Sequence, residues 1–427
     1  MPTIAAIATG PARGGIGVLR ISGPKALDAA RVVAPALPPF PVPRHAYFLP
    51  FTVDEGLALY FQAPASFTGE DVVELHAHGS PRGLALLLEA VTKVAGVRVA
   101  RPGEFTQRAF LNGRMDLARA EAVADLIAAD SEAAVRAAAA QLAGALSEKL
   151  SALRGPLVGL HADLEAALDF PEDAEGAESD AAQRLEVSLE GLRALRDQGL
   201  RGGLVRRGAH VVLYGPVNAG KSTLFNRLVG ADRALVDEAP GTTRDALEAV
   251  LEWEGLQVTL VDTAGLRDAP ERLEARGIER TRLALKSADL AVLLLPPDAP
   301  ADEVAKWQAG VAPRLDVVGK SDLAGPASGL SVSGQSGAGV ERLRATILEV
   351  LGYRRAEAVA LSSARHLEAI DRAVEAVERA LTAHRVSTLE VVAGEVGIAL
   401  KALGEITGED ARVELIDAVF RRFCLGK

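Results

Sequence analysis

The chain has 427 residues, a formal net charge of -10 at pH 7, and 49% hydrophobic and 24% charged residues. This length predicts about two to four domains, since one core rarely grows beyond roughly 250–300 residues. The acidic balance argues against a protein that coats nucleic acid non-specifically. The single cysteine excludes an internal disulfide framework and favours the reducing cytoplasm. We expect no signal peptide and no membrane-spanning segment.

The first 117 residues alternate short apolar runs with glycine and proline, which predicts strands. The runs are "TIAAIAT", "GIGVLRIS", "LALYFQA" and "DVVELHAHG". The segment "SPRGLALLLEAVTKVAG" predicts a helix that ends near Gly96. We therefore expect an α+β domain over residues 1–117.

The remaining chain predicts an α/β domain flanked by helices. Residues 118–206 and 354–427 carry apolar residues at helical spacing, and their alanine-rich stripes favour helix-on-helix packing. Between them, residues 207–353 alternate helical segments with the apolar runs "HVVLY", "VTLVDT", "DLAVLLL", "LDVVG" and "LSVS", which is typical of a parallel sheet. We expect a multidomain α/β plus all-α protein, in which the α/β domain is inserted into one helical domain.

The segment "VVLYGPVNAGKSTLFNRL" predicts a phosphate-binding loop, because Gly215 and Gly220-Lys221-Ser222 fit G-x-x-x-x-G-K-S between a strand and a helix. Its backbone N–H groups can face phosphate oxygens, Lys221 can reach the β and γ phosphates, and Ser222 can bind Mg²⁺. Asn218 has two interpretations. Its side-chain oxygen could help to hold a monovalent cation, or it merely caps the loop.

Three later segments indicate a GTPase rather than a generic ATPase. In "VDTAG", Asp262 can hold Mg²⁺ through water and Gly265 can offer its N–H to the γ phosphate. In "APGTTRD", Thr242 and Thr243 are placed to form a switch, and "VVGKSD" ends a later strand. This order is similar to that of the translation-factor-like GTPases. Leu266 follows the D-x-x-G motif and cannot orient water as a glutamine would, so hydrolysis needs another group.

The guanine-recognition motif departs from N-K-x-D, since the chain has Gly319-Lys320-Ser321-Asp322. The Asp322 carboxylate can still accept hydrogen bonds from the two guanine N–H groups that adenine lacks. The missing asparagine removes hydrogen bonds that brace the base, at a cost of about 1–2 kcal/mol. We expect guanine preference with weaker binding.

Longer motifs spread over the whole chain resemble the MnmE (TrmE) family of tRNA modification GTPases, which are TrmE-Era-EngA-like GTPases. They are "ATGPARGGIGVLRISG", "SFTGEDVVELHAHG", "RPGEFTQRAFLNGRMDLARAEAVADLI", "GPVNAGKSTLFN", "GTTRD", "DTAGLRD", "GIER" and the terminal "FCLGK". The resemblance implies a folate-binding, aminomethyltransferase-like N-terminal domain that forms a homodimer, and an inserted G domain that dimerises with K⁺ when GTP is hydrolysed.

The resemblance also implies a reaction. With the flavoprotein MnmG (GidA), in a heterotetramer or larger complex, the family adds a carboxymethylaminomethyl group to C5 of the wobble uridine (position 34) of certain tRNAs. A tetrahydrofolate derivative, 5,10-methylene or 5-formyl, would supply the one-carbon unit.

Site residues follow from the same resemblance. Ser222 and Thr243 match Mg²⁺ ligands, and Glu274 in "LEARGIER" matches the glutamate that orients the attacking water. The positions that match the K⁺ site are Asn218, Asp237, Ala239 and Thr242. The positions that match folate contacts are Arg20, Glu74, Arg114 and Lys427. We expect the nucleotide to contact further residues of its motifs: Ala219, Thr223, Glu238, Pro240, Gly241, Thr263, Ala264 and Ser333.

The strand "DVVELHAHG" supports part of this assignment through its own residues. Alternation puts Glu74, His76 and His78 on one face. A carboxylate can bind the adjacent N–H donors of a flat pterin, and Arg114 or Arg20 could bind the anionic glutamate tail. A metal site on this face and an ordinary solvated face are the alternatives.

Two other functions remain open from the sequence. The first is a GTPase switch that only binds RNA, such as a ribosome-assembly factor, because related G domains serve such proteins. The second is a folate-dependent aminomethyltransferase with an accessory nucleotide domain.

An acidic protein that binds tRNA needs a local basic patch or a basic partner. Candidates for the patch, which are otherwise ordinary surface charges, are Arg98, Arg101, Arg108, Arg114, Arg421 and Arg422. The end of the chain holds Cys424, which is either a small buried hydrophobe or a thiol near the one-carbon site. We expect this end to fold back onto the N-terminal domain of its own or the partner subunit.

Overall fold

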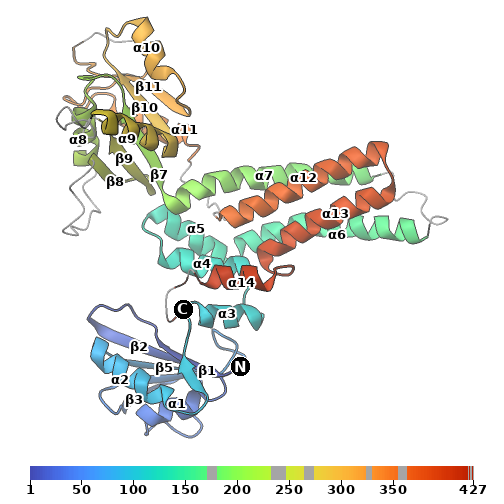
Figure 1. The fold of residues 1–427 in the computed structure, drawn as a ribbon. Coiled ribbons are helices and arrows are strands. Elements are labelled where there is room, and N and C mark those ends of the chain that lie inside the picture. Colours follow the sequence, from blue (N-terminus) through green and yellow to red (C-terminus); the bar gives the residue numbers. More distant parts are fainter. Residues whose placement is uncertain are drawn as a thin grey trace. The chain divides into compact units, whose positions relative to one another are not determined.

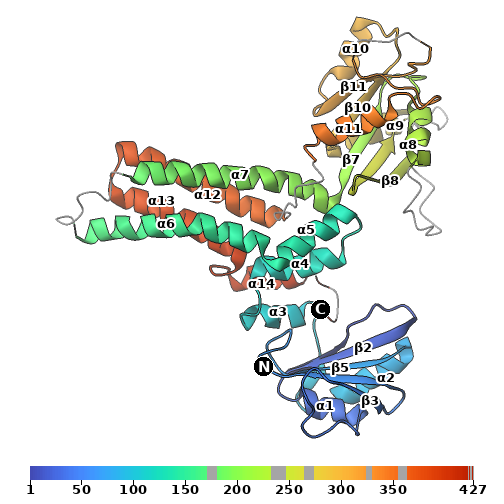
Figure 2. The same cartoon turned by 180° about the vertical axis from the view of Figure 1, so that it is seen from behind.

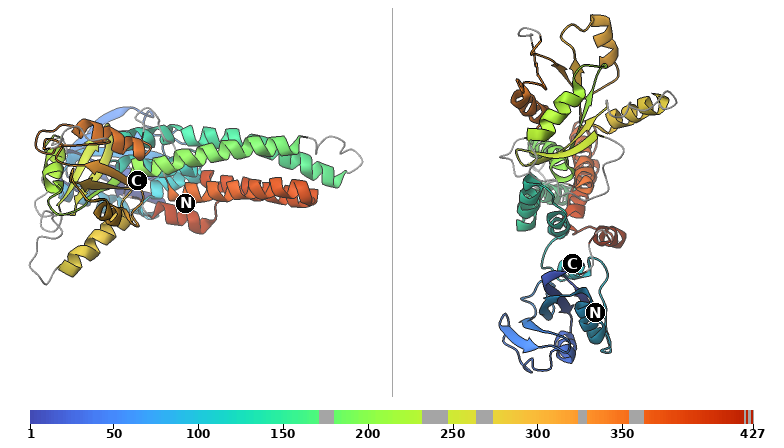
Figure 3. Two further views of the ribbon diagram at one scale, coloured as in Figure 1. Left: turned by 90° about the horizontal axis from the view of Figure 1, so that it is seen from above. Right: turned by 90° about the vertical axis from the view of Figure 1, so that its left-hand side faces the viewer.

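The computed structural model describes residues 1–170, 180–231, 247–263, 274–323, 329–353, 363–421, 423 and 426. The chain divides into two compact units. Unit 1 comprises Met1–Ala128, Gln141–Leu189 and Arg372–Lys427, and unit 2 comprises Ala129–Ala140 and Glu190–Asp371. Figures 1, 2 and 3 show their elements from several sides. Within the described ranges, no helix is both long and apolar enough to cross a bilayer.

A six-stranded sheet begins unit 1, in the order β3-β4-β5-β2-β1-β6. All neighbouring strands are antiparallel except β1 and β6. The four predicted strands are confirmed, and β3 and β6 were not predicted. The bounds are β1 Thr3–Ile7, β2 Gly14–Ser22, β3 Ala46–Pro50, β4 Glu55–Phe61, β5 Val72–Gly79 and β6 Val97–Val99.

The two faces of this sheet differ in their cover. Helices α1 (Ala26–Val33) and α2 (Pro81–Thr92) pack on one face, where they bury residues such as Leu19 and Leu75. Because side chains alternate along β2 and β5, Arg20 and Glu74 belong to the opposite face. The apolar part of that face contacts Phe105 of α3 (Glu104–Leu111).

The rest of unit 1 is helical. α4 (Leu117–Ile127), α6 (Ala145–Asp169), α13 (Leu389–Thr407) and α14 (Val413–Phe420) follow the sheet, and α6 and α13 pack along each other (Figure 1). α3, α4 and α14 share a small core around Leu117, Phe420 and Phe423. The long helical stretch expected after residue 117 is interrupted between α4, α5 (Glu132–Ala143) and α6. α7 (Ala181–Arg207) and α12 (Ala364–Val386) each have residues in both units.

The end of the chain returns to its own N-terminal strand. Gly426 lies so close to the end of β1 that an added Cβ would meet the Ile7 carbonyl and lie 3.0 Å from the Ala8 Cα. The expected fold-back onto an N-terminal domain is therefore confirmed.

Unit 2 contains a five-stranded sheet in the order β11-β10-β7-β9-β8. The strands are parallel except β8, which pairs antiparallel with β9. β8 was not predicted, and the expected strand "LSVS" is reduced to one bridge between Val318 and Ser331. The bounds are β7 Ala209–Tyr214, α8 Lys221–Ala231, β8 Leu247–Trp253, β9 Leu256–Asp262, α9 Glu274–Ser287, β10 Leu290–Leu295, α10 Ala301–Gln308, β11 Arg314–Val318 and α11 Val340–Val350.

Candidate functional site

The loop between β7 and α8 has the backbone that a phosphate-binding loop requires. Gly215 (φ 141°), Asn218 (φ 61°) and Gly220 (φ 98°) lie in the left-handed region, which glycine adopts without strain and asparagine tolerates. The loop starts at the carboxyl end of the central strand and leads into the first turn of α8. Backbone N–H groups at a helix start attract anions, so this geometry suits phosphate.

Lys221 is buried within this loop. Its ammonium group donates hydrogen bonds to the carbonyl oxygens of Gly215 (3.1 Å) and Pro216 (2.8 Å). The charge is therefore held at the loop, where it can bind an entering phosphate. Ser222 is half-buried in the first turn of α8, and Asn218 is exposed at the tip of the loop.

Asp262 lies beside the loop on the neighbouring strand. β9 pairs with β7 so that Asp262 is opposite Leu213, and the carboxylate is fully buried. The Thr263 hydroxyl donates to the Leu213 carbonyl at 2.9 Å and fixes the end of β9 against β7. Ser222 supplies a hydroxyl in the first turn of α8, and Asp262 supplies a carboxylate at the end of β9. Both are oxygen groups of the kind that Mg²⁺ prefers.

A cavity of about 120 Å³ adjoins the loop, and the predicted base-recognition residues Lys320 and Asp322 line it. Ala219, Gly220 and Thr223 line one side, and Lys320 and Asp322 line another. The Ser333 hydroxyl accepts a hydrogen bond from the Ser336 N–H at 3.1 Å, so it stabilises its own turn. Its neighbours Val332 and Gly334 line the cavity.

Several predicted residues lie outside the part of the chain that the structure describes. They are Asp237, Glu238, Ala239, Pro240, Gly241, Thr242, Thr243, Ala264, Gly265, Leu266, Arg422, Cys424 and Lys427. Glu274 begins α9, but its side chain is not among the described ones. The switch, the K⁺ ligands and the roles of Cys424 and Lys427 therefore stay predictions.

Unit 1 brings Arg20 and Glu74 together. β2 and β5 pair so that the two residues are opposite each other, and Arg20 Nε donates to Glu74 Oε1 at 2.8 Å. Glu74 Oε2 lies 3.2 Å from His76 Nε2. The Arg20 guanidinium also lies 5.7 Å from the ring centroids of both Phe67 and Phe105. The result is a half-buried ion pair whose guanidinium lies near two aromatic rings, and such a pair can bind a flat polar ring.

The other predicted residues of this face have different surroundings. His78 is exposed and contacts the Asp54 carboxylate at 2.8 Å, which raises the pKa of the histidine. The two histidines therefore have different carboxylate partners, and no group of three or more His, Cys, Asp or Glu among the described residues is arranged to hold a metal ion. Arg114 is exposed, and its stem lies against the turn at Gly69.

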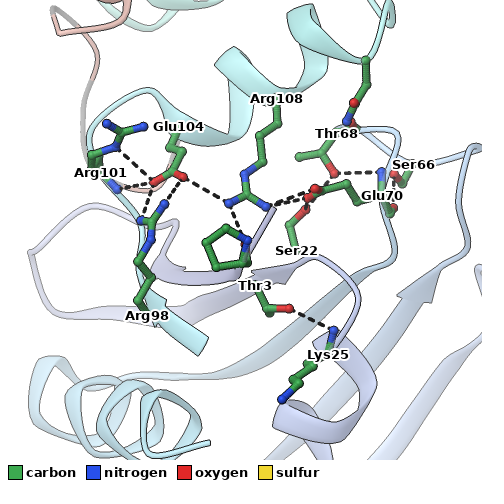
Figure 4. A network of polar contacts seen from close by, with 12 residues as sticks. Thr3, Ser22, Lys25, Ser66, Thr68, Glu70, Arg98, Arg101, Glu104 and Arg108 are labelled. Carbon is green, nitrogen blue, oxygen red and sulfur yellow. Dashed lines mark hydrogen bonds and ion pairs between the residues drawn. The ribbon is translucent and has the colours of Figure 1, made fainter. Parts of the chain in front are cut away.

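The structure adds a buried ionic network that the sequence did not predict (Figure 4). The Arg108 side chain is 2% exposed and donates to Glu70 at 2.9 Å, Glu104 at 3.1 Å and the Pro2 carbonyl at 2.8 Å. Arg98 also binds Glu104. Burial would raise the pKa of Glu104, but hydrogen bonds from Arg98, Arg108 and the Arg101 backbone outweigh it and lower that pKa to about 2. The helical i,i+4 spacing of Glu104 and Arg108 was the available signal.

This network corrects the expected basic patch. Arg108 is an interior residue, so it cannot contact tRNA. Arg98 is committed to Glu104, whereas Arg101 and Arg114 are exposed. Arg108 is therefore excluded from the expected patch, whereas Arg98, Arg101 and Arg114 remain at least partly exposed.

Comparison with known proteins decides the family. Residues 3–114 match the GTP-binding protein TrmE N-terminus, and residues 117–424 match the MnmE helical domain. The tRNA modification GTPase MnmE of Myxococcus xanthus is 59% identical over 436 residues, which cover 100% of this chain and 99% of that protein. The chain belongs to the MnmE family of tRNA modification GTPases. As an MnmE-family tRNA modification GTPase, the protein binds GTP.

Other proteins are also similar to it. The tRNA modification GTPase MnmE of Chromobacterium violaceum is 42% identical over 450 residues, covering 100% of this chain and 98% of that protein. Among solved structures, the G domain of the T. maritima FeoB iron transporter is 25% identical, covers 33% of this chain and 98% of its own, and has a TM-score of 0.26.

Proposed function

We propose that this MnmE-family GTPase acts with the flavoprotein MnmG to add a carboxymethylaminomethyl group to C5 of the wobble uridine of certain tRNAs. GTP hydrolysis depends on K⁺, and a folate provides the one-carbon unit. The observation that carries the proposal is the Arg20–Glu74 pair, whose guanidinium lies 5.7 Å from the ring centroids of Phe67 and Phe105. A GTPase switch that only binds RNA has no need for such a cluster.

The nucleotide site prepares hydrolysis by holding the phosphates. Lys221 leaves its two carbonyl acceptors to neutralise charge on the β and γ phosphates. Ser222 and Thr243 would hold Mg²⁺ directly, with Asp262 acting through water. Bound Mg²⁺ would shield the charge that develops on the phosphate oxygens.

Small signalling GTPases orient the attacking water with a glutamine, and this chain has Leu266 at that position. Another residue must therefore orient the water. We assign this role to Glu274, the first residue of α9. The exposed Asn218 would hold K⁺ together with Asp237, Ala239 and Thr242. A cation at this place would neutralise phosphate charge as an arginine finger does.

The cluster in unit 1 fits the pterin ring of a folate. Arg20 fixes Glu74 from one side, and each carboxylate oxygen keeps a further lone pair for the adjacent N–H groups of the ring. Phe67 is partly exposed beside the pair and offers a stacking surface. Arg114 and Lys427 would bind the anionic tail. Homodimerisation, tRNA binding and a cytoplasmic location complete the proposal.

A titration with 5-formyltetrahydrofolate tests the proposal on the full-length protein. Glu74→Gln should weaken folate binding about tenfold or more, because a charged hydrogen-bond acceptor is lost. GTP hydrolysis should not change. Glu89→Gln is the matched control, since Glu89 is an exposed residue of α2. Wild-type protein that binds no folate would contradict the proposal and favour the RNA-binding switch.

Two further measurements separate the remaining alternatives. GTP hydrolysis should be faster in K⁺ than in Na⁺ at equal ionic strength, and equal rates would contradict the assigned role of Asn218. An aminomethyltransferase with an accessory nucleotide domain would modify tRNA without hydrolysing GTP and without MnmG.

A further inference from the structure

Two glycines from different segments, Gly319 and Gly334, line the base-recognition cavity of unit 2. Gly319 directly follows β11, and Gly334 lies in the loop before α11. Both line the cavity of about 120 Å³ that also contains Asp322. Neither glycine has a φ in the left-handed region, so the backbone conformation does not require glycine at these positions. The lack of space for a side chain does.

Gly319 packs directly on the phosphate-binding loop. A Cβ at this position would lie 2.7 Å from the Ala219 carbonyl oxygen and 3.2 Å from Leu294 Cγ. The glycine cannot easily move away, because its N–H donates to the Leu295 carbonyl at 2.7 Å. Any side chain here would therefore push the 319–322 segment and the loop apart.

Gly334 makes the same kind of contact with α8. A Cβ at Gly334 would lie 2.8 Å from the Leu224 nitrogen and 2.9 Å from the Thr223 carbonyl carbon. Arg227 of α8 holds this loop in place, since its Nε donates to the Gly334 carbonyl at 3.0 Å. The loop at Gly334, which forms the second wall of the cavity, is thus also packed directly on the backbone of α8.

We infer that Gly319 and Gly334 are a matched pair of specificity-determining positions, which set the shape of the guanine pocket through backbone contacts. They position Asp322, which is the one carboxylate among the described residues that line the cavity. The glycine at position 319 then has a role of its own, beyond the loss of the asparagine side chain. In this chain, restoring the N-K-x-D motif would displace the Ala219 carbonyl and weaken nucleotide binding.

The test compares four variants of the full-length protein: Gly319→Ala, Gly319→Asn, Gly334→Ala and the control Gly203→Ala. Gly203 is in α7, and an added Cβ would meet nothing within 4 Å. The dissociation constants of GDP and of IDP, which lacks the 2-amino group that Asp322 can bind, are measured for each. The ratio of the two dissociation constants depends on the position of Asp322. A general loss of stability would weaken the binding of both nucleotides and would leave this ratio unchanged.

The first three variants should bind GDP about tenfold or more weakly, as overpacked sites do, and should show a smaller preference for GDP over IDP. The control should stay within about twofold of wild type. Tighter GDP binding by Gly319→Asn would overturn the inference. So would unchanged GDP binding, or an unchanged GDP-to-IDP ratio, in Gly319→Ala and Gly334→Ala. If Gly319→Asn does not fold, the two alanine variants decide, since each adds only a Cβ.

Discussion

The phosphate-binding loop of unit 2 and the Arg20–Glu74 cluster of unit 1 are built in different ways. The loop is one continuous segment between β7 and α8, and its function depends on local backbone geometry. The cluster joins residues that are 54 positions apart, which meet only because β2 and β5 pair in one register. Local geometry can be predicted from a sequence motif. The contact between Arg20 and Glu74 can be predicted only when the register of the two strands is known.

Loss of the loop lysine should have the largest effect. Lys221→Ala removes the ammonium group that binds the β and γ phosphates, and we expect GTP hydrolysis to fall about a thousandfold. Steady-state phosphate release measures this. Folate binding to unit 1 should not change, so one variant tests both sites.

The control for this substitution is Lys306→Ala. Lys306 is on α10 and is 78% exposed, so its removal should leave hydrolysis unchanged. Lys221→Ala protein with near-normal hydrolysis would show that the loop is not the catalytic phosphate site.

The glycine-rich motif of unit 2 predicted the loop between β7 and α8 for a physical reason. Gly215, Gly220 and Lys221 act through backbone conformation and helix position, which neighbouring residues determine. The antiparallel β8 was not predicted, since Glu, Ala and Leu in "EAVLEW" are residues that favour a helix. In unit 1, the sequence placed Glu74 on the right strand. The burial of Arg108 was not predicted, because its partner Glu70 comes from a distant loop and the i,i+4 spacing to Glu104 is equally typical of an exposed helix pair.

Disruption of the ionic network should destabilise unit 1 strongly. Arg108→Met leaves Glu70 and Glu104 without their buried partner, which costs about 3–5 kcal/mol of unfolding free energy. Urea unfolding measures the loss. Arg82→Met is the control, because Arg82 is an exposed residue of α2 outside this network. Equal stability of the two variants would mean that the network contributes little.

Replacement of Asp322 should change which base is selected. Asp322→Asn replaces an acceptor by a donor, which no longer fits the guanine N–H groups but can donate to the 2-oxo group of xanthine. We expect GDP binding to weaken about a hundredfold and xanthosine diphosphate to bind better than GDP. A competition titration measures both. An unchanged preference for GDP would place the base elsewhere.

The smallest effect concerns pH. The pKa of Glu104 is about 2 in the folded protein and 4.5 as its ordinary value. Because folding lowers this pKa, the contribution of Glu104 is complete above pH 4.5 and is lost as the pH falls towards 2. Urea midpoints of unit 1 should therefore decrease across this range. Glu104→Gln should be less stable at pH 7 and should lose less stability on acidification, and a parallel decrease in both proteins would contradict this role.

We propose that the nucleotide site of unit 2 and the Arg20–Glu74 cluster of unit 1 serve one reaction on tRNA. The most direct measurement is mass spectrometry of tRNA nucleosides from a strain that lacks the gene, complemented with wild type, Lys221→Ala or Glu74→Gln. We predict that the C5-modified wobble uridine disappears on deletion and returns only with the wild-type gene. Persistence of the modification in the deletion strain, or its full return with either variant, would contradict the account.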